Sequence, residues 1–179
     1  MKHLVIGLLA IVLSSNIPDK IDFGSAKDFT FGALNDGVMG GMSKGMATYT
    51  EESVKLIGEI SLANNGGFSS LKGPFKPIDL SEVKYIKVKY KSEGVGFAMT
   101  LETDRRWFIP YFKFDLDKTD GEWKEVKLPI KKFRKYNIGR FTGDTVTISE
   151  LEKVIRLGFI SNEKQEKEFV FEVDYIDFI

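Results

Sequence analysis

The segment YIKVKYKSEGVGFAMTL, residues 85–101, contains two runs in which apolar and polar residues alternate. The apolar positions are Tyr85, Ile86, Val88 and Tyr90 in the first run, and Val95, Phe97, Met99 and Leu101 in the second. A period of two places alternate side chains on one face of a β-strand. The segment therefore predicts two half-buried strands.

The same pattern extends outward from this segment in both directions. It occurs at Val54, Leu56, Ile60 and Leu62, and again at Phe169, Phe171, Val173 and Tyr175. Three further runs, 107–114, 123–130 and 154–160, are rich in aromatic and branched residues and are separated by glycine, Asp or Asn turns. Such spacing is typical of β-sandwiches and barrels. Pro110 and Pro129 cannot donate to a sheet, so their strands should lie at an edge or carry a bulge.

Helix signals are few. Thr147-Ile148-Ser149-Glu150 has the pattern of a capping box and predicts a short helix, and Asp79-Leu80-Ser81 predicts a second helical turn. We therefore expect an all-β protein, a jelly-roll β-sandwich of two antiparallel sheets with one or two short helical turns. A chain of 179 residues fits one such domain, here residues 16–179.

Residues 1–15, MKHLVIGLLAIVLSS, resemble a secretory signal peptide, with a basic residue at Lys2, an apolar stretch 4–13 and then Ser14 and Ser15. The stretch is too short to span a bilayer as a helix, so we expect no stable membrane insertion of the mature chain. The expected location is periplasmic or secreted. The alternative is a cytoplasmic protein in which these residues form an N-terminal strand. The chain has no cysteine, which leaves the redox compartment undetermined.

The charges are balanced, with 26 basic and 26 acidic residues, so no overall field attracts nucleic acid. The most basic stretch contains Lys124, Lys127, Lys131, Lys132, Arg134 and Lys135. We interpret it as a solvated strand and turn. Nucleic acid is therefore not an expected partner.

The inventory of reactive residues argues against most catalysis. The single histidine, His3, lies in the predicted signal peptide, so the mature chain would contain neither histidine nor cysteine. Histidine- and cysteine-dependent catalysis and the usual zinc, copper and iron ligands are then excluded. A pair of carboxylates remains as a minor alternative for a glycoside-active enzyme, drawn from Asp36, Glu102, Asp104, Asp115, Asp117 and Asp174. No cofactor is expected; a structural calcium ion at Asp36 or Asp174 is a further minor alternative.

Two glycine-rich segments are the main candidates for a binding site. The candidate residues are Asn35, Asp36, Gly37, Met39, Gly40, Gly41 and Ser43 in the first segment, and Asn65, Gly66, Gly67, Phe68 and Ser70 in the second. Neither segment has a phosphate-binding glycine pattern, so nucleotide binding is not expected. Glycine permits tight turns, and Asn and Asp cap them. The segments are either structural turns or a pair of loops that present a polar docking surface.

Arg105, Trp107 and Tyr111 form a third group of candidates. An arginine beside aromatic rings suits either a sugar or a hot spot for a protein partner. Burial of Trp107 in the core is an equal alternative.

The two glycine-rich segments also carry a family resemblance. Asn35-Asp36-Gly37-Val38-Met39-Gly40-Gly41 with Ser43, followed by Asn65-Gly66-Gly67-Phe68 with Ser70, is similar to the paired signature of the complex I intermediate-associated protein family. Asp79-Leu80-Ser81, Trp123, Pro129, Phe133, Gly158-Phe159 and the closing run 169–176 follow in the same order. The resemblance covers the chain from about Phe23 to its end.

The resemblance implies a galactose-binding-like jelly-roll fold and a non-catalytic role in binding partly assembled protein, as in the mitochondrial assembly chaperone of respiratory complex I. We therefore expect a protein partner first. An exported carbohydrate-binding module is the alternative, and a carboxylate-based enzyme is third. Exposure of Trp107 and Tyr111 on a concave face would favour sugar, whereas an apolar patch around Met39, Met42 and Phe68 would favour protein.

Overall fold

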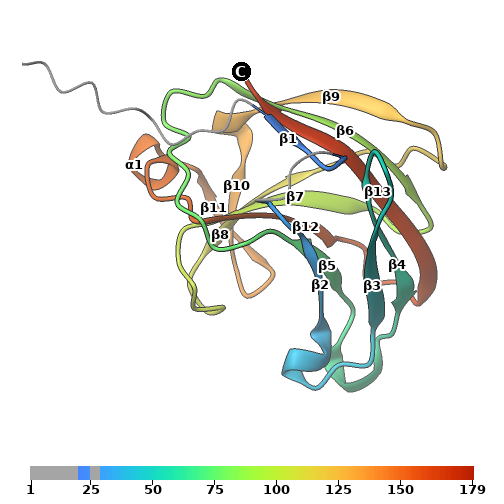
Figure 1. Ribbon diagram of the computed structural model, residues 1–179. Helices are drawn as coiled ribbons and strands as arrows, with labels where there is room; N and C mark the ends of the chain where they lie inside the picture. The colour runs from blue at the N-terminus through green and yellow to red at the C-terminus, as the bar shows by residue number, and fades with distance from the viewer. Residues whose placement is uncertain (1–19, 25–28) are drawn as a thin grey trace, which may run out of the picture.

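The computed structural model describes residues 20–24 and 29–179, which form two antiparallel sheets packed face to face (Figure 1). The strands are β1 (Lys20–Asp22), β2 (Gly32–Asn35), β3 (Lys44–Tyr49), β4 (Val54–Ile60), β5 (Ser69–Lys72), β6 (Tyr85–Glu93), β7 (Phe97–Glu102), β8 (Tyr111–Asp115), β9 (Lys124–Pro129), β10 (Arg134–Asn137), β11 (Arg140–Thr145), β12 (Arg156–Ser161) and β13 (Lys167–Phe178). The helical elements are α1 (Ile148–Leu151) and three 3-10 turns, η1 (Asp36–Met39), η2 (Ala63–Asn65) and η3 (Ile130–Lys132).

The first sheet has the order β3-β4-β13-β6-β9, and β1 also pairs with β13. β13 is its spine, because it pairs with β4 and β1 along one side and with β6 along the other. The second sheet has the order β11-β10-β8-β7-β12-β5-β2. We call them the six-stranded and the seven-stranded sheet.

Aromatic side chains join the two sheets. Phe171 of β13 stacks on Phe97 of β7 with a centroid distance of 4.3 Å, and it contacts Phe159 of β12 at 5.0 Å. All three rings are buried. Each ring lies on the side of its strand that faces the other sheet. Because alternate side chains of a strand point to the same side, the period of two in the sequence produces the inward face of each sheet.

The strands predicted from alternation are confirmed as β4, β6, β7 and β13. Pro129 ends β9, an edge strand, as its missing N–H requires. The prediction for Pro110 is wrong. β8 starts only at Tyr111 and lies between β7 and β10. Pro110 therefore precedes a central strand, and Trp107 lies in the β7–β8 loop.

The two helical signals also have clear outcomes. Glu150 accepts a hydrogen bond from the Thr147 backbone N–H (2.9 Å), and the capping box at the start of α1 is complete. At Asp79-Leu80-Ser81 the backbone makes a turn in which the Ser81 N–H donates to Asp79 Oδ1 (2.9 Å). The predicted signal peptide, residues 1–15, lies outside the described residues.

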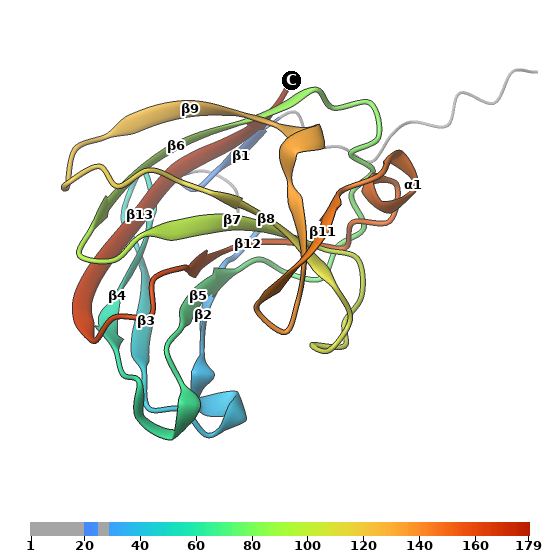
Figure 2. The ribbon, with the colours of Figure 1, turned by 180° about the vertical axis from the view of Figure 1, so that it is seen from behind.

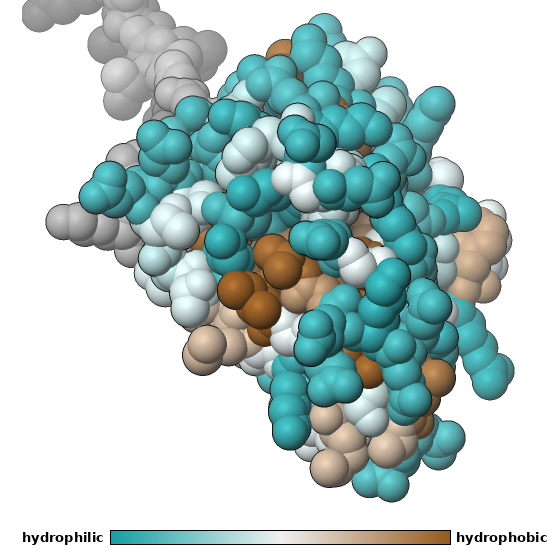
Figure 3. Space-filling view, turned by 90° about the vertical axis from the view of Figure 1, so that its right-hand side faces the viewer, coloured by the Kyte–Doolittle hydropathy of each residue, from teal (hydrophilic) through white to brown (hydrophobic). Residues whose placement is uncertain are grey.

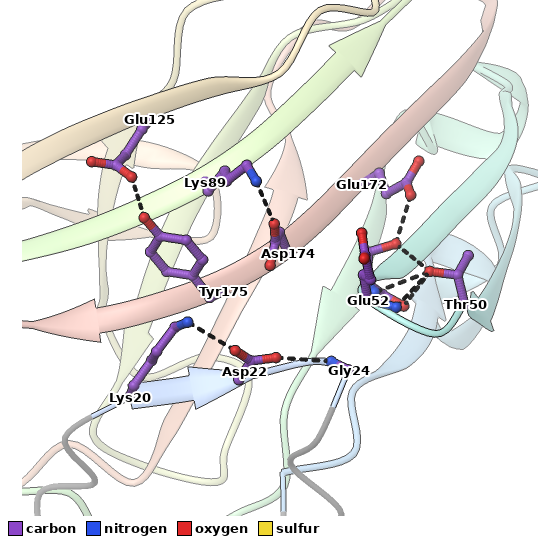
Figure 4. A network of polar contacts seen from close by, with 11 residues as sticks. Lys20, Asp22, Gly24, Thr50, Glu52, Lys89, Glu125, Glu172, Asp174 and Tyr175 are labelled. Carbon is purple, nitrogen blue, oxygen red and sulfur yellow. Dashed lines mark hydrogen bonds and ion pairs between the residues drawn. The ribbon is translucent and has the colours of Figure 1, made fainter.

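The outer face of the six-stranded sheet is dominated by paired charges (Figure 4). Lys89 pairs with Asp174 (2.7 Å), and Ser53 donates to Glu172 (2.6 Å), which also pairs with Lys91 (3.0 Å). Figure 3 shows mostly hydrophilic side chains on the side of β3, β4 and β13, with a smaller hydrophobic patch.

Candidate functional site

The Asp36 carboxylate joins the two glycine-rich segments. Its Oδ1 accepts a hydrogen bond from the Ser43 backbone N–H (2.9 Å), and Oδ2 accepts one from the Ser43 hydroxyl (2.6 Å). Oδ2 also accepts the backbone N–H groups of Gly67 (2.6 Å) and Phe68 (3.2 Å). Burial opposes ionisation of Asp36, but these four donors lower its pKa. One buried carboxylate therefore fixes both segments in a single arrangement.

Two of the glycines are required by the position of this carboxylate. A Cβ atom on Gly41 would lie 2.3 Å from Asp36 Cγ, and one on Gly66 would lie 2.5 Å from Oδ2. Gly40 ends η1 with a φ of +88°, a conformation that favours glycine. The paired sequence signature thus corresponds to one packed unit, which Figures 1 and 2 show as η1 beside the β4–β5 connection.

A second set of contacts supports the same unit. The Asn35 side chain donates to the Gly45 carbonyl (3.0 Å) and accepts from the Ser69 hydroxyl (2.7 Å). Asn64 donates to the Gly40 carbonyl (3.1 Å) across the two segments. The Asn side chains thus form hydrogen bonds with backbone groups that the tight turns leave without a backbone partner.

The candidate residues divide into buried and exposed groups. The side chains of Asp36, Ser43 and Ser70 are buried, whereas Met39 is 55% exposed and Val38 is 68% exposed. Gly37 has open space around it, and Asn65 and Gly66 line a cavity described below. The structure thus gives Asp36 and Ser43 internal roles. The Met39 side chain, in contrast, is exposed at the surface.

Two adjoining cavities, of about 310 and 420 Å³, lie beside this unit. They share the lining residues Met39, Phe68, Tyr111, Ile138, Gly139 and Ile160, and we call them together the groove. The groove lies on the outer face of the seven-stranded sheet, between η1, the β7–β8 loop and the β10–β11 turn. These three segments extend from the same side of the molecule in Figures 1 and 2.

The third candidate group lies in the same groove. Arg105, Trp107 and Tyr111 line the smaller cavity, and Trp107 is 65% exposed. Tyr111 is half-buried and stacks on Tyr136 at 6.1 Å, and burial raises the pKa of Tyr111 to about 12. All three candidate groups therefore meet at one place, although they lie up to 76 residues apart in the sequence, from Asn35 to Tyr111.

A buried charge network forms the floor of the groove and was not predicted from the sequence. Lys72 Nζ donates to Thr100 Oγ1 (3.0 Å) and to Glu102 Oε1 (2.6 Å). The Lys72 side chain reaches these partners on β7 by crossing Gly158 of β12, where a Cβ atom would lie 2.6 Å from Lys72 Cδ. Arg156 lies 3.8 Å from the other oxygen of Glu102. On β5, the polar residues Ser70 and Lys72 lie on either side of Leu71. This alternation was the one local sequence signal that one face of the strand is polar.

The six candidate carboxylates all have partners. Glu102 and Asp36 are engaged as described, and Asp104 accepts two hydrogen bonds from the Arg106 guanidinium, which lower its pKa. The remaining pairs are Asp115 with Lys113 and Arg134, Asp117 with Lys124, and Asp174 with Lys89. Within residues 20–24 and 29–179, no group of three or more His, Cys, Asp or Glu side chains is placed to hold a metal ion. No helix in this described part is long and apolar enough to cross a membrane.

The sandwich and its groove place the protein in a structural class, the galactose-binding-like β-sandwiches that include carbohydrate-binding modules. Within that class, the family model of complex I intermediate-associated protein 30 (CIA30) matches residues 21–173. The chain belongs to the CIA30 family, which confirms the resemblance seen in the two glycine-rich segments.

Solved structures share the fold at low sequence identity. The family 11 carbohydrate-binding module of the cellulase Lic26A-Cel5E of Clostridium thermocellum is 15% identical with a TM-score of 0.59, covering 93% of this chain and 95% of that one. The family 11 module from the same organism in complex with a β-1,3-1,4-mixed-linked tetrasaccharide is 16% identical with a TM-score of 0.56, covering 89% and 92%. The agarase AgWH50C is 9% identical with a TM-score of 0.55, covering 88% of this chain but 25% of that one. No curated protein sequence matches the chain.

Proposed function

We propose that this protein is a non-catalytic binding module that holds an extended segment of a partner polypeptide in the groove. The observation that carries the proposal is the set of exposed apolar side chains around the groove. Met39 is 55% exposed and Ile138 56%, and both line the groove, whereas the exposure of Trp107 there (65%) suits either ligand class. Methionine and tryptophan are enriched in the centres of protein interfaces, and flexible methionine adapts to varied side chains.

The walls suit a polypeptide in a second way. Leu34, Ile109, Pro110 and Ile160 add aliphatic surface between the two cavities and the β7–β8 loop. Aliphatic walls accept apolar side chains, while the rim offers polar backbone for hydrogen bonds. The family description, which names association with an assembly intermediate, supports a protein ligand.

The hydrogen bonds and ion pairs of the carboxylates, and the direction of their pKa shifts, support a binding role without catalysis. A glycosidase needs one carboxylic acid with a raised pKa. Hydrogen bonds and cations instead lower the pKa of Asp36 and Asp104, and Glu102 is bound by Lys72. The only histidine of the chain is His3.

An oligosaccharide is the second candidate ligand. Trp107 and Tyr111 line one cavity, and aromatic rings beside polar groups bind sugars. One structure with the same fold holds a mixed-linked tetrasaccharide, which gives this alternative a specific probe.

The layout of residues 1–15 leads us to propose export of the protein, with removal of this segment. Mass determination of the protein from its native host tests this proposal. An intact N-terminus would support the alternative of a cytoplasmic protein.

A peptide array and a glycan array, probed with the same purified protein, test the proposed ligand class. We expect binding to peptides that is lost in Trp107→Ala and retained in Trp123→Ala. Trp123 is a matched control because it is 42% exposed and contacts Lys89 and Lys91 of the six-stranded sheet, away from the groove. Binding to glycans alone, with the same dependence on Trp107, would establish the second candidate instead.

A further inference from the structure

The groove is positively charged although the whole chain is neutral. Its two cavities are lined by six cationic side chains, Lys72, Arg105, Arg106, Lys113, Arg156 and Lys164, and by three carboxylates, Asp36, Glu102 and Asp104. The lining residues carry an excess of three positive charges, one of which, Lys113, pairs with Asp115 outside the lining, in a protein with 26 basic and 26 acidic residues. A hollow surface concentrates such a field and favours an anionic ligand.

Two arginines that line the smaller cavity, Arg105 and Arg156, both contact the ring of Phe75. Arg105 lies over the ring of Phe75 at 4.6 Å, and Arg156 lies over the same ring at 4.4 Å. In the described part of the chain, the Arg105 side chain forms no ion pair with a carboxylate. The aromatic ring contacts both cations, and of the two only Arg156 has a carboxylate, Glu102, within 4 Å in the described part of the chain.

The neighbouring carboxylate is already shared. Glu102 is 2.6 Å from Lys72 and 3.8 Å from Arg156, so it serves two cations at once. Two cations, Lys72 and Arg156, therefore share one carboxylate, and Arg105 lines the same cavity without an ion-pair partner in the described part of the chain. Burial lowers the pKa of Lys72, and the nearby charge of Arg156 lowers it further. A second anion at this position would offset the repulsion.

A hydrogen-bonding group without a partner lines the same cavity. Ser70 is fully buried, and its hydroxyl has no hydrogen-bond partner in the structure. A buried hydroxyl without a partner costs about 1–3 kcal/mol, so such groups usually serve a ligand or water. The serine adds a neutral donor to the charged floor.

We propose that the polypeptide segment bound in this groove is acidic, with a carboxylate that pairs with Arg105 and Arg156 beside Phe75 while apolar side chains contact Met39 and Trp107. Arginine suits this role because its planar fork binds a carboxylate through two hydrogen bonds. The inference rests on the proposed function and specifies the chemistry of its ligand.

The test uses four labelled probes with the full-length protein: a peptide of alternating leucine and glutamate, the same peptide with glutamine, oligogalacturonate and the mixed-linked β-glucan tetrasaccharide. We expect the glutamate peptide to bind roughly tenfold more tightly than the glutamine peptide, with an affinity that falls as salt rises. Arg105→Gln should remove most of this difference. Lys132→Gln, an exposed charge on η3, is the control and should change neither.

The outcomes separate the inference from the proposed function. Equal binding of the two peptides would overturn the acidic ligand and leave the polypeptide-binding function standing. If neither peptide binds, the polypeptide-binding function and the inference are both overturned, whether or not a sugar probe binds. If Arg105→Gln still prefers the glutamate peptide, Arg105 does not recognise the carboxylate of the ligand, and the proposal is overturned.

Discussion

The Asp36 carboxylate accepts a hydrogen bond from the backbone N–H of Gly67, 31 residues later, with an oxygen–nitrogen distance of 2.6 Å. This contact and three others from Ser43 and Phe68 make two loops behave as one unit. The unit forms one wall of the groove, since Met39 and Phe68 line both cavities. The exposed side chains of this wall are therefore positioned by a buried residue.

Asp36→Asn should destabilise the protein by about 2–4 kcal/mol, because an amide cannot accept all four hydrogen bonds and leaves buried donors unpaired. Urea denaturation measures the change. Asp144→Asn, at an exposed position in β11, should cost less than about 0.5 kcal/mol. Equal effects of the two substitutions would contradict the central role of Asp36.

The contribution of Asp36 should depend on pH. Its folded-state pKa lies below the ordinary value of 3.8, so its stabilising effect is present above that value and is lost as the pH falls through the folded-state pKa. Asn does not titrate. The gap in the free energy of unfolding between the wild type and Asp36→Asn should therefore be constant near neutrality and narrow below about pH 4. A gap that stays constant in acid would show that the carboxylate charge is not what stabilises the loops.

Three glycines of these loops provide a matched set. Gly41→Ala and Gly66→Ala place a Cβ atom within 2.5 Å of the Asp36 carboxyl group and should each cost about 1–3 kcal/mol. Gly37→Ala meets no atom within 4 Å and should change stability by less than about 0.5 kcal/mol. Thermal unfolding of the three variants checks the order. A Gly37 variant as unstable as the others would point to backbone conformation as the cause.

Gly158→Ala should disturb the floor of the groove. The new methyl group would lie 2.6 Å from Lys72 Cδ and 2.9 Å from the Leu71 carbonyl oxygen, so we expect a loss of about 1–3 kcal/mol. Gly32→Ala is the control, because Gly32 flanks Lys72 on the opposite strand and has nothing within 4 Å. Similar unfolding midpoints for the two variants would mean that Lys72 does not need the gap at Gly158.

Removing one member of the buried ion pair should cost more than removing both. Glu102→Leu leaves Lys72 and Arg156 without their carboxylate and should destabilise by about 3 kcal/mol. The double variant Lys72→Met, Glu102→Leu should recover part of that loss. A double-mutant cycle by denaturant unfolding gives the coupling energy. Strictly additive losses would show that the 2.6 Å contact contributes nothing.

Strands with one buried face were predictable from sequence, and those without one were not. β4, β6 and β13 alternate between buried and more exposed positions, so their periodicity appears in the residue order. β7 alternates in its residue types although its residues 97–101 are all buried. β11 is exposed at every position and carries no such signal. The run 107–114 looked like a strand because it is aromatic, but Trp107 belongs to a loop whose aromatic side chain faces the groove.

The residues of the site also divide into those that the sequence predicted and those that it did not. The glycine-rich segments were identified because their composition is local and unusual. The network of Lys72, Thr100 and Glu102 joins residues about 30 positions apart, and Arg156 comes from a third strand. Each is an ordinary polar residue in its own segment. Only the strand order of the seven-stranded sheet brings them together.

The central position of β13 bears on how the protein reaches its folded state. The strand comes last in the order of elements yet separates β4 and β1 from β6. The other described strands are synthesised before β13, so β4 and β6 have open edges until β13 emerges. Long-range pairing of this kind is slow and exposes strands to aggregation. The newly made chain is therefore at risk of aggregation until β13 pairs with β4 and β6.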